Sequence, residues 1–264
     1  MTRSPSTESG VFRLVAEPPP VGEVPLWVQP EWEKRFPWLI QGTTGEGDPA
    51  DPFDLGAYGA VPTGDLMGRW RSMLQATGMR TVVHARQVHE AEVAEWMEPL
   101  PSGLIHVDSF DAQVTDREGL LLAVSVADCV PVFLVSETSR IIGVAHAGWR
   151  GVAAGIVERL VRRIGAAEGV PRQSLWLHCG PAICGICYEV GPEVHESVNP
   201  NAEPPSRPTP IDIRRSIAER AAEVGVAPHQ ITVSRHCTRC GPGGFFSHRA
   251  GSPKRQMGVL GRRS

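Results

Sequence analysis

The chain has 264 residues, 41% hydrophobic and 21% charged, so it can bury a sizeable core and global disorder is disfavoured. Its formal net charge of −3 gives no basic field for a phosphate backbone, which disfavours general nucleic-acid binding. The apolar runs are shorter than a membrane span and the N-terminal residues lack a signal-peptide core, so we expect a cytoplasmic protein with no membrane partner.

The N-terminal residues 1–30 are rich in proline and serine. This composition predicts an extended N-terminal arm with little regular structure. We expect residues 31–264 to form a single catalytic domain, interrupted by a long exposed loop at residues 199–210, where prolines cluster.

The middle of the chain contains successive apolar segments. Residues 120–127 form a continuous apolar run that is typical of a strand buried on both faces, and residues 130–135 and 140–145 predict two more strands. Residues 151–165 change to a helical period, and Gly165 is a plausible C-cap of that helix.

The last third continues with mixed elements. Residues 174–178, 231–234 and 257–260 predict short strands, and residues 212–224 predict a helix with Asp212 as its N-cap. Several strands follow one another without helices between them, which argues against a doubly wound fold and favours an α+β sandwich.

Three of the apolar segments end in a side chain that can bind metal: His89, Cys129 and His146. Two imidazoles and one thiolate suit zinc with one open coordination position, where a bound water can be activated. Copper could occupy the same site, because it competes strongly for such ligands. Taken alone, the spacing is also compatible with a buried free cysteine and two ordinary histidines.

Five segments carry a resemblance to a known family: QVH, ADCVP, HAGWRG, GPAICGICYEVG, and CT followed by FFSHR. In this order they resemble the YfiH-like laccase-domain family, whose members also carry the names polyphenol oxidase and purine nucleoside phosphorylase. The resemblance implies that His89, Cys129 and His146 bind zinc. It also implies an α+β fold, a multilayer α/β/β/α sandwich resembling the CNF toxin/YfiH-like fold.

The resemblance further implies a zinc-dependent purine nucleoside phosphorylase acting on adenosine, inosine or methylthioadenosine, and an adenosine deaminase activity. The expected partners are small molecules, a nucleoside and phosphate. One alternative is a zinc amidohydrolase that edits UDP-muramoyl-L-serine cell-wall precursors, so that the substrate is a nucleotide-sugar amino acid. A metal-free version would use Cys129 as nucleophile and His146 as base. A non-enzymatic metal-binding protein is the third alternative, and the oligomeric state is left open.

Further residues could contact the substrate. Arg150 and Arg249 could hold phosphate, although a surface ion pair is the plainer interpretation of either. Gly148, at the start of a helix, allows close approach of an anion to backbone N–H groups. Gln87 lies two residues before the QVH histidine and could reach the same cleft, and Asp128 could accept a proton, orient a ligand or cap a turn.

The sequence also departs from the family pattern. The arginine that the family usually carries in a segment corresponding to residues 42–47 is absent, and the SYRR-type segment at residues 247–250 keeps only one of its two arginines. Which arginine replaces the missing one is left open.

The histidines exclude a true multicopper oxidase. The chain has nine histidines and no His-x-His pair, whereas a four-copper laccase needs about ten histidine ligands, many in such pairs.

The remaining cysteines form two CxxC pairs, Cys184 with Cys187 and Cys237 with Cys240, while Cys179 stands in an apolar strand and is expected in the core. Two such pairs can form a zinc site with four thiolates. The long gap between them equally allows buried or redox-capable thiols.

Overall fold

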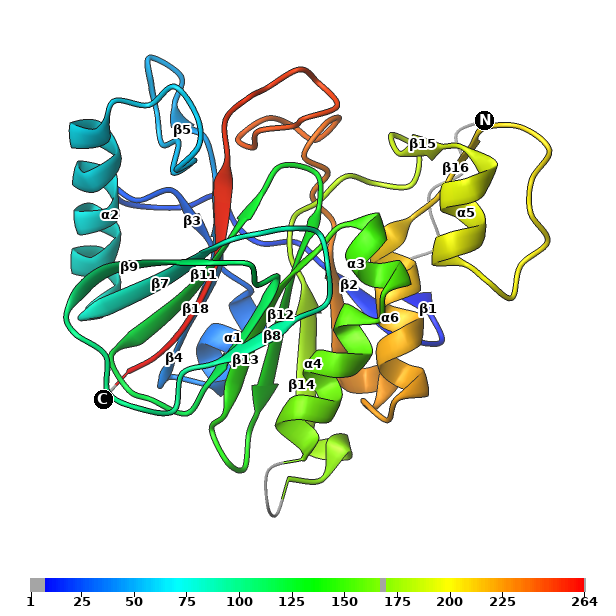
Figure 1. Ribbon diagram of the computed structural model, residues 1–264, viewed down its shortest axis with the longest axis horizontal. Coiled ribbons are helices and arrows are strands. Elements are labelled where there is room, and N and C mark those ends of the chain that lie inside the picture. Colours follow the sequence, from blue (N-terminus) through cyan, green and yellow to red (C-terminus); the bar gives the residue numbers. More distant parts are fainter. Residues whose placement is uncertain (1–7, 167–169, 264) are drawn as a thin grey trace.

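The computed structural model describes residues 8–166 and 170–263, and it contains two large β-sheets with helices on their outer faces (Figure 1). The eight-stranded sheet has the order β1 (Glu8–Ser9), β2 (Phe12–Val15), β17 (Ile231–Ser234), β14 (Leu175–Cys179), β12 (Val130–Ser136), β13 (Ile142–Ala147), β10 (Ala112–Thr115), β8 (Val93–Glu95). The six-stranded sheet has the order β3 (Leu26–Trp27), β4 (Leu39–Thr44), β18 (Gln256–Arg262), β11 (Leu120–Val126), β7 (Thr81–Arg86), β9 (Gly103–Asp108).

The remaining elements are short strand pairs and helices. Two small hairpins are β5 (Gly47–Asp48) with β6 (Asp51–Pro52) and β15 (Glu189–Val190) with β16 (Thr209–Pro210). The helices are α1 (Pro30–Arg35), α2 (Thr63–Thr77), α3 (Trp149–Ala153), α4 (Ile156–Gly165), α5 (Pro192–Val198) and α6 (Ile213–Glu223). Among the described residues, no helix is long and apolar enough to cross a bilayer.

Three apolar clusters hold the layers together. Between the sheets, Leu122 and Val124 of β11 pack with Phe133 of β12. On the outer face of the eight-stranded sheet, α4 and α6 cover the other side of β12, and on the outer face of the six-stranded sheet α2 packs against β11 (Figure 1). The layer order is therefore helix, sheet, sheet, helix, and the predicted α+β class is confirmed.

The two-sided burial explains the apolar run in the middle of the sequence. In β11, Leu121 and Ala123 face the cluster under α2, whereas Leu122 and Val124 face the other sheet. Because both faces of this strand are covered, its residues do not alternate between apolar and polar. The prediction of a strand buried on both faces is confirmed.

The other predicted strands also match closely. The segments at 130–135, 174–178, 231–234 and 257–260 correspond to β12, β14, β17 and β18, and the segment at 140–145 corresponds to β13, shifted by two residues. In the predicted helix over 212–224, which is α6, the Asp212 side chain accepts a hydrogen bond from the Arg214 N–H, so Asp212 is the N-cap.

One predicted helix is wrong as a single element. Residues 151–165 divide between α3 and α4, because Gly155 adopts a left-handed conformation with φ 83° and interrupts the helix. Glycine has no Cβ penalty in this region, so it breaks the helix without strain. The second helix includes Gly165 and is capped by Ala166, so Gly165 is not the C-cap.

The prediction of little regular structure at residues 1–30 is wrong for the part that the structure describes, residues 8–30. Residues Phe12–Val15 form β2, which pairs in parallel with β17, and Leu26–Trp27 form β3, which pairs with β4. The prolines of this segment lie outside both strands, so they remove no hydrogen-bond donor from either sheet. Residues 1–7 of the predicted arm lie outside the described residues.

Candidate metal centre

Three ligands from separate strand ends meet at one point. His89 follows β7, Cys129 lies in the turn between β11 and β12, and His146 lies near the end of β13. Their ligand atoms all lie within 4.8 Å of one another, and the two imidazole rings are perpendicular, with centroids 4.8 Å apart. His146 is buried, Cys129 is half-buried and His89 is exposed, so the trio opens to solvent on one side.

Strand pairing explains why they converge. In the antiparallel pair of β12 and β13, Pro131 is opposite His146, so Cys129, directly before β12, lies beside the end of β13. Gly148 follows the end of β13, and a Cβ added there would lie 3.1 Å from Cys129 Sγ and 3.3 Å from His89 Cδ2. A side chain at this position would therefore crowd two of the three ligands.

The carboxylate of Asp111 positions the metal trio, and this role was not predicted from the sequence. Its buried carboxylate is 2.8 Å from His146 Nδ1, and it accepts hydrogen bonds from the backbone N–H groups of Val88, His89 and Glu90 at 3.0–3.1 Å. These three bonds fix the backbone around His89, whose φ of 62° is unusual for a non-glycine residue. The only sequence signal was an acidic residue directly before the four residues that form β10.

The electrostatics of the trio favour a thiolate beside an imidazolium in the metal-free protein. Burial opposes the thiolate, but the charge of His146 and hydrogen bonds from His146 and His89 outweigh it and lower the pKa of Cys129 to about 6. Burial opposes the imidazolium too, but the charge of Cys129 and the hydrogen bond to Asp111 raise the pKa of His146 to about 9. A divalent cation would take the place of the proton between these groups.

The donor set fits zinc. Two imidazole nitrogens and one thiolate match its preferred ligands, and three protein ligands leave one position for a reactant. The hydrogen bond from His146 Nδ1 to Asp111 leaves Nε2 with its lone pair free for the ion. The three residues could therefore hold a catalytic zinc ion.

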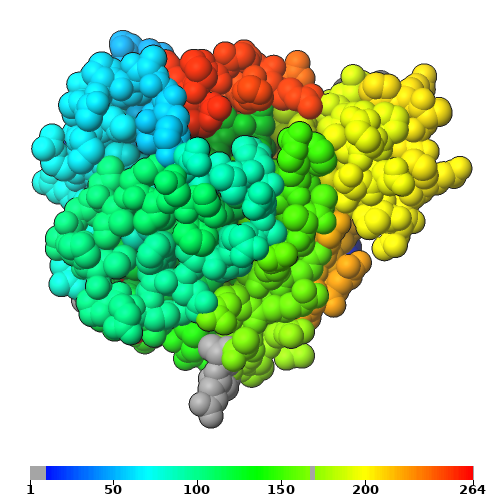
Figure 2. Space-filling model, in the orientation of Figure 1, coloured from blue at the N-terminus to red at the C-terminus, as the bar shows by residue number. Residues whose placement is uncertain are grey.

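A cavity of about 440 Å³ opens beside the trio. All three ligands line it, together with residues 56–59 and with His248, Pro253 and Arg255. These two segments come from distant parts of the chain and lie near each other on the face shown in Figure 2. This volume is within the range of about 300–1,000 Å³ for small-molecule sites.

Several polar residues of the cavity wall were not predicted. His84 Nε2 is 2.8 Å from Ser125 Oγ, and the Tyr58 hydroxyl makes a short contact with His106, which in turn lies 3.2 Å from His84. Burial, with a smaller contribution from the charge of His106, lowers the pKa of His84 to about 3, so it is neutral near pH 7. The signal for His84 and Ser125 was a polar residue inside an otherwise apolar strand.

Of the predicted substrate-binding residues, Gln87 lines the cavity, and its amide donates to the Ser125 carbonyl at 2.7 Å and accepts from the Ser125 N–H at 2.8 Å. Both ends of this amide are therefore engaged in holding β11. Asp128, with φ 84°, is buried and accepts from Thr238 Oγ1 at 2.6 Å and from the Arg249 N–H at 2.7 Å. These hydrogen bonds indicate that Asp128 stabilises the turn before Cys129.

The two predicted arginines lie away from the cavity wall. Arg150 is exposed and lies over the Trp149 ring at 4.2 Å. Arg249 donates to the Glu189 carbonyl at 2.9 Å and lies over the Tyr188 ring at 4.8 Å. The structure thus brings together the metal trio, Gln87 and the neighbouring Gly148, but neither arginine, and the cavity instead carries Arg86 and Arg255.

Comparison with known proteins identifies the family. Residues 49–263 match the family described as "Multi-copper polyphenol oxidoreductase laccase", so the chain belongs to this laccase-domain family. The resemblance inferred from the motifs is confirmed. The crystal structure of YlmD from Geobacillus stearothermophilus is similar with a TM-score of 0.77 and 27% identity, covering 87% of this chain and 94% of that one.

Relatives in this family carry enzyme names. A purine nucleoside phosphorylase of Xylella fastidiosa (strain Temecula1) is 33% identical over 87% of this chain and 94% of its own length. Purine nucleoside phosphorylase YlmD of Geobacillus stearothermophilus is 36% identical over 60% of this chain, and adenosine deaminase RL5 of an unknown prokaryotic organism is 35% identical over 54%. These last two alignments span 61% and 58% of the relatives' own lengths.

Proposed function

We propose that this chain is a zinc-dependent purine nucleoside phosphorylase that acts with phosphate on adenosine, inosine or methylthioadenosine, and that it also deaminates adenosine. The observation that carries the proposal is the convergence of His89, Cys129 and His146 at the wall of a cavity of nucleoside size. The names of the relatives support the same chemistry.

The metal would be held by these three residues, and when bound it would supply a Lewis acid that polarises a reacting atom. Asp111 orients His146 toward it and keeps the ring in the tautomer that leaves Nε2 available. Gly148 keeps the space next to Cys129 and His89 free for a substrate atom. The chain's own contribution is thus to fix the ligands rigidly before substrate arrives.

The far wall of the cavity suits an uncharged base. His84 is neutral near pH 7 and its two ring nitrogens are engaged by Ser125 and His106, so it adds no charge to this wall. We assign the purine ring to this wall, and the sugar then lies between it and the metal trio. Phosphate attack at the sugar C1′ forms the C1′–O bond, breaks the C1′–N9 bond and releases the base, which takes up one proton.

Phosphate needs a cationic group at the cavity, and Arg255 supplies it. Among the described residues Arg86 is paired with Asp108 at 3.0 Å, whereas Arg255 forms no ion pair. A guanidinium that lacks a carboxylate partner is the better anion site. Arg150 of the HAGWRG motif remains the competing candidate from the sequence.

The experiment is incubation of the purified protein with inosine, with and without phosphate, followed by chromatography of the products. Phosphate-dependent release of hypoxanthine with ribose 1-phosphate supports the proposal, and conversion of adenosine to inosine supports the deaminase activity. The His146→Ala variant should lose both. Release of hypoxanthine without phosphate, or release of serine from UDP-muramoyl-L-serine, would instead support hydrolysis. Inactivity on every substrate favours the metal-binding alternative.

Two arginine variants decide the phosphate site. Arg255→Gln should raise the KM for phosphate while Arg150→Gln, its matched control outside the cavity, leaves it unchanged. The opposite result would place phosphate at the HAGWRG motif.

The metal should be a single ion at this site. Among the described residues, the other cluster of potential ligands contains cysteines alone, so no second group of histidines exists there for a copper cluster. All six cysteines are unpaired thiols in the structure, which suits the reducing cytoplasm that we propose as its location.

A further inference from the structure

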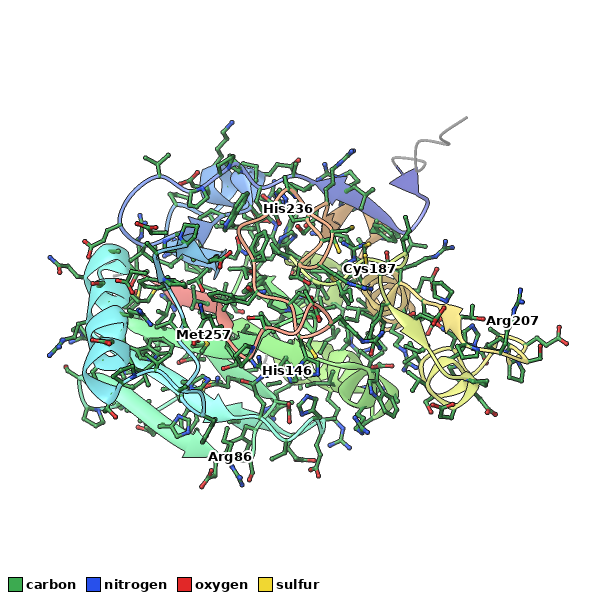
Figure 3. All side chains as sticks on the ribbon, turned by 90° about the horizontal axis from the view of Figure 1, so that it is seen from above. Arg86, His146, Cys187, Arg207, His236 and Met257 are labelled. Atoms are coloured by element: carbon green, nitrogen blue, oxygen red, sulfur yellow. The ribbon has the colours of Figure 1, made fainter. Side chains whose placement is uncertain are left out.

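Four cysteines gather away from the cavity in a second cluster. The Sγ atoms of Cys184, Cys187, Cys237 and Cys240 all lie within 4.8 Å of one another. Figure 3 shows Cys187 at a position separate from His146 of the first site. We propose that these four thiolates bind a second, structural zinc ion that braces the loop carrying Cys129.

The spacing of the sulfur atoms fits a tetrahedral ion. Zinc–sulfur bonds of about 2.3 Å directed to the corners of a tetrahedron put the sulfurs about 3.8 Å apart. Cys184 Sγ and Cys240 Sγ, from the two different CxxC pairs, are 3.7 Å apart. This separation matches the sulfur–sulfur distance of a tetrahedral zinc site. It is much longer than the bond of about 2.05 Å in a disulfide.

The two CxxC segments also form the same turn. The N–H of Tyr188 donates to the Cys184 carbonyl at 3.1 Å, and the N–H of Gly241 donates to the Cys237 carbonyl at 3.0 Å, four residues on in both cases. An added Cβ at Gly241 would lie 2.4 Å from the Cys237 carbonyl, so the second turn requires glycine, whereas the first carries Tyr188 at the matching position. Both turns share the same closing hydrogen bond, and together they present four sulfurs to one point.

Backbone donors point at the sulfur of Cys237. The N–H groups of Cys184 and Cys240 lie 3.2 and 3.4 Å from Cys237 Sγ. Such bonds favour the thiolate form that a metal needs. One of the donors comes from the opposite turn, so the two turns are already joined across the cluster.

Burial in the core does not account for the cluster. Cys179 is the core cysteine with which the cluster can be compared. It is fully buried, and burial raises the pKa of its thiol far above the ordinary value. Cys184 is half-buried and Cys240 is exposed. Four sulfur ligands gathered at one point favour zinc among the common biological cations.

The cluster is connected to the first metal centre through Asp128. Thr238, inside the second CxxC pair, donates its hydroxyl to the Asp128 carboxylate at 2.6 Å. Ile183, directly before the first pair, donates its N–H to the Asp128 carbonyl at 3.1 Å. Asp128 precedes Cys129 in the chain, so both turns hold the backbone that positions the thiolate ligand of the first site.

The test starts with the zinc content of the purified protein. We expect two zinc ions per chain in the wild type and one in His89→Ala/His146→Ala, which lacks the first site. The variant Cys184→Ser/Cys240→Ser should lose the second ion, whereas Cys179→Ala, the matched control for removal of a thiol, should keep two.

The decisive measurement is zinc X-ray absorption on His89→Ala/His146→Ala, because the cysteine cluster is then the one remaining group of metal ligands in the part of the chain that the structure describes. Four sulfur neighbours at about 2.3 Å support the proposal. One zinc per wild-type chain, nitrogen or oxygen neighbours, iron in place of zinc, or disulfides between the two turns by mass spectrometry would each overturn it. This result does not depend on activity, so it stands apart from the proposed function, and it remains decisive if the cysteine variant fails to fold.

Discussion

Asp111→Asn tests whether one buried carboxylate organises the metal trio. The change keeps the size and removes the charge. Oδ1 serves His146 Nδ1 and the His89 N–H, and Oδ2 serves the N–H groups of Val88 and Glu90. Whichever way the new amide turns, its NH2 group faces two donors.

The magnitude follows from those contacts. Each buried donor left without an acceptor costs about 1–3 kcal/mol, so two of them should lower the free energy of unfolding by about 3 kcal/mol. Loss of the group that orients a ligating histidine should also weaken zinc binding about 10–100-fold. Burial raises the pKa of Asp111, but the hydrogen bonds from His146 and from the backbone N–H groups outweigh it. The pKa of Asp111 in the folded protein is therefore lowered.

The assay is urea unfolding of the zinc-free protein, followed by competition for zinc with a chelator of known affinity. Asp108→Asn is the matched control, because that side chain is 75% exposed and makes a surface ion pair with Arg86. We expect this control to change stability by about 0–1 kcal/mol. If Asp111→Asn behaves like the control in both measurements, Asp111 does not organise the site.

Three further predictions concern the site and the core. Gly148→Ala should weaken zinc binding about tenfold in chelator competition, since the new methyl group would lie 3.1 Å from Cys129 Sγ and 3.3 Å from His89 Cδ2; unchanged affinity would mean that the ligands move freely. The pKa of His84 is about 3 in the folded protein and about 6.5 in the unfolded chain, so between these values the unfolded chain binds a proton that the folded protein does not. The contribution of His84 to stability is therefore present above pH 6.5 and is lost as the pH falls toward 3. In urea unfolding without zinc, His84→Asn should therefore lose less stability than the wild type between pH 7 and 5, and parallel curves would contradict this. Leu122→Ala, between the two sheets, should lower the free energy of unfolding by about 2–5 kcal/mol with the zinc content of the folded protein unchanged, whereas a loss below 1 kcal/mol would show a loosely packed interior.

Local pattern was sufficient to predict most of the strands, whereas the prediction of the metal trio also needed the family resemblance. The strands β11 and β12 are almost entirely apolar, and a run of apolar residues by itself indicates a strand buried on both faces. His89, Cys129 and His146 could be singled out because metal-binding residue types stand at strand ends within recognisable motifs.

Features that depend on distant partners could not be predicted. Asp111 acts only because β10 pairs with β13, and nothing in its own neighbourhood shows that His146 will lie opposite. Arg150 looked suitable by its motif, yet the direction of α3 leaves it outside the cavity, whereas Arg255 enters through a loop more than a hundred residues away. Strand β2 was missed because its parallel partner, β17, is formed near the other end of the chain.

The position of β18 in the six-stranded sheet has a consequence for synthesis in the cell. This last strand lies between β4 and β11 and pairs with both. Until β18 has been synthesised and inserted, β4 and β11 have open edges, which are templates for wrong pairing with other nascent chains. A chain that lacks Gln256–Arg262 should therefore yield insoluble product.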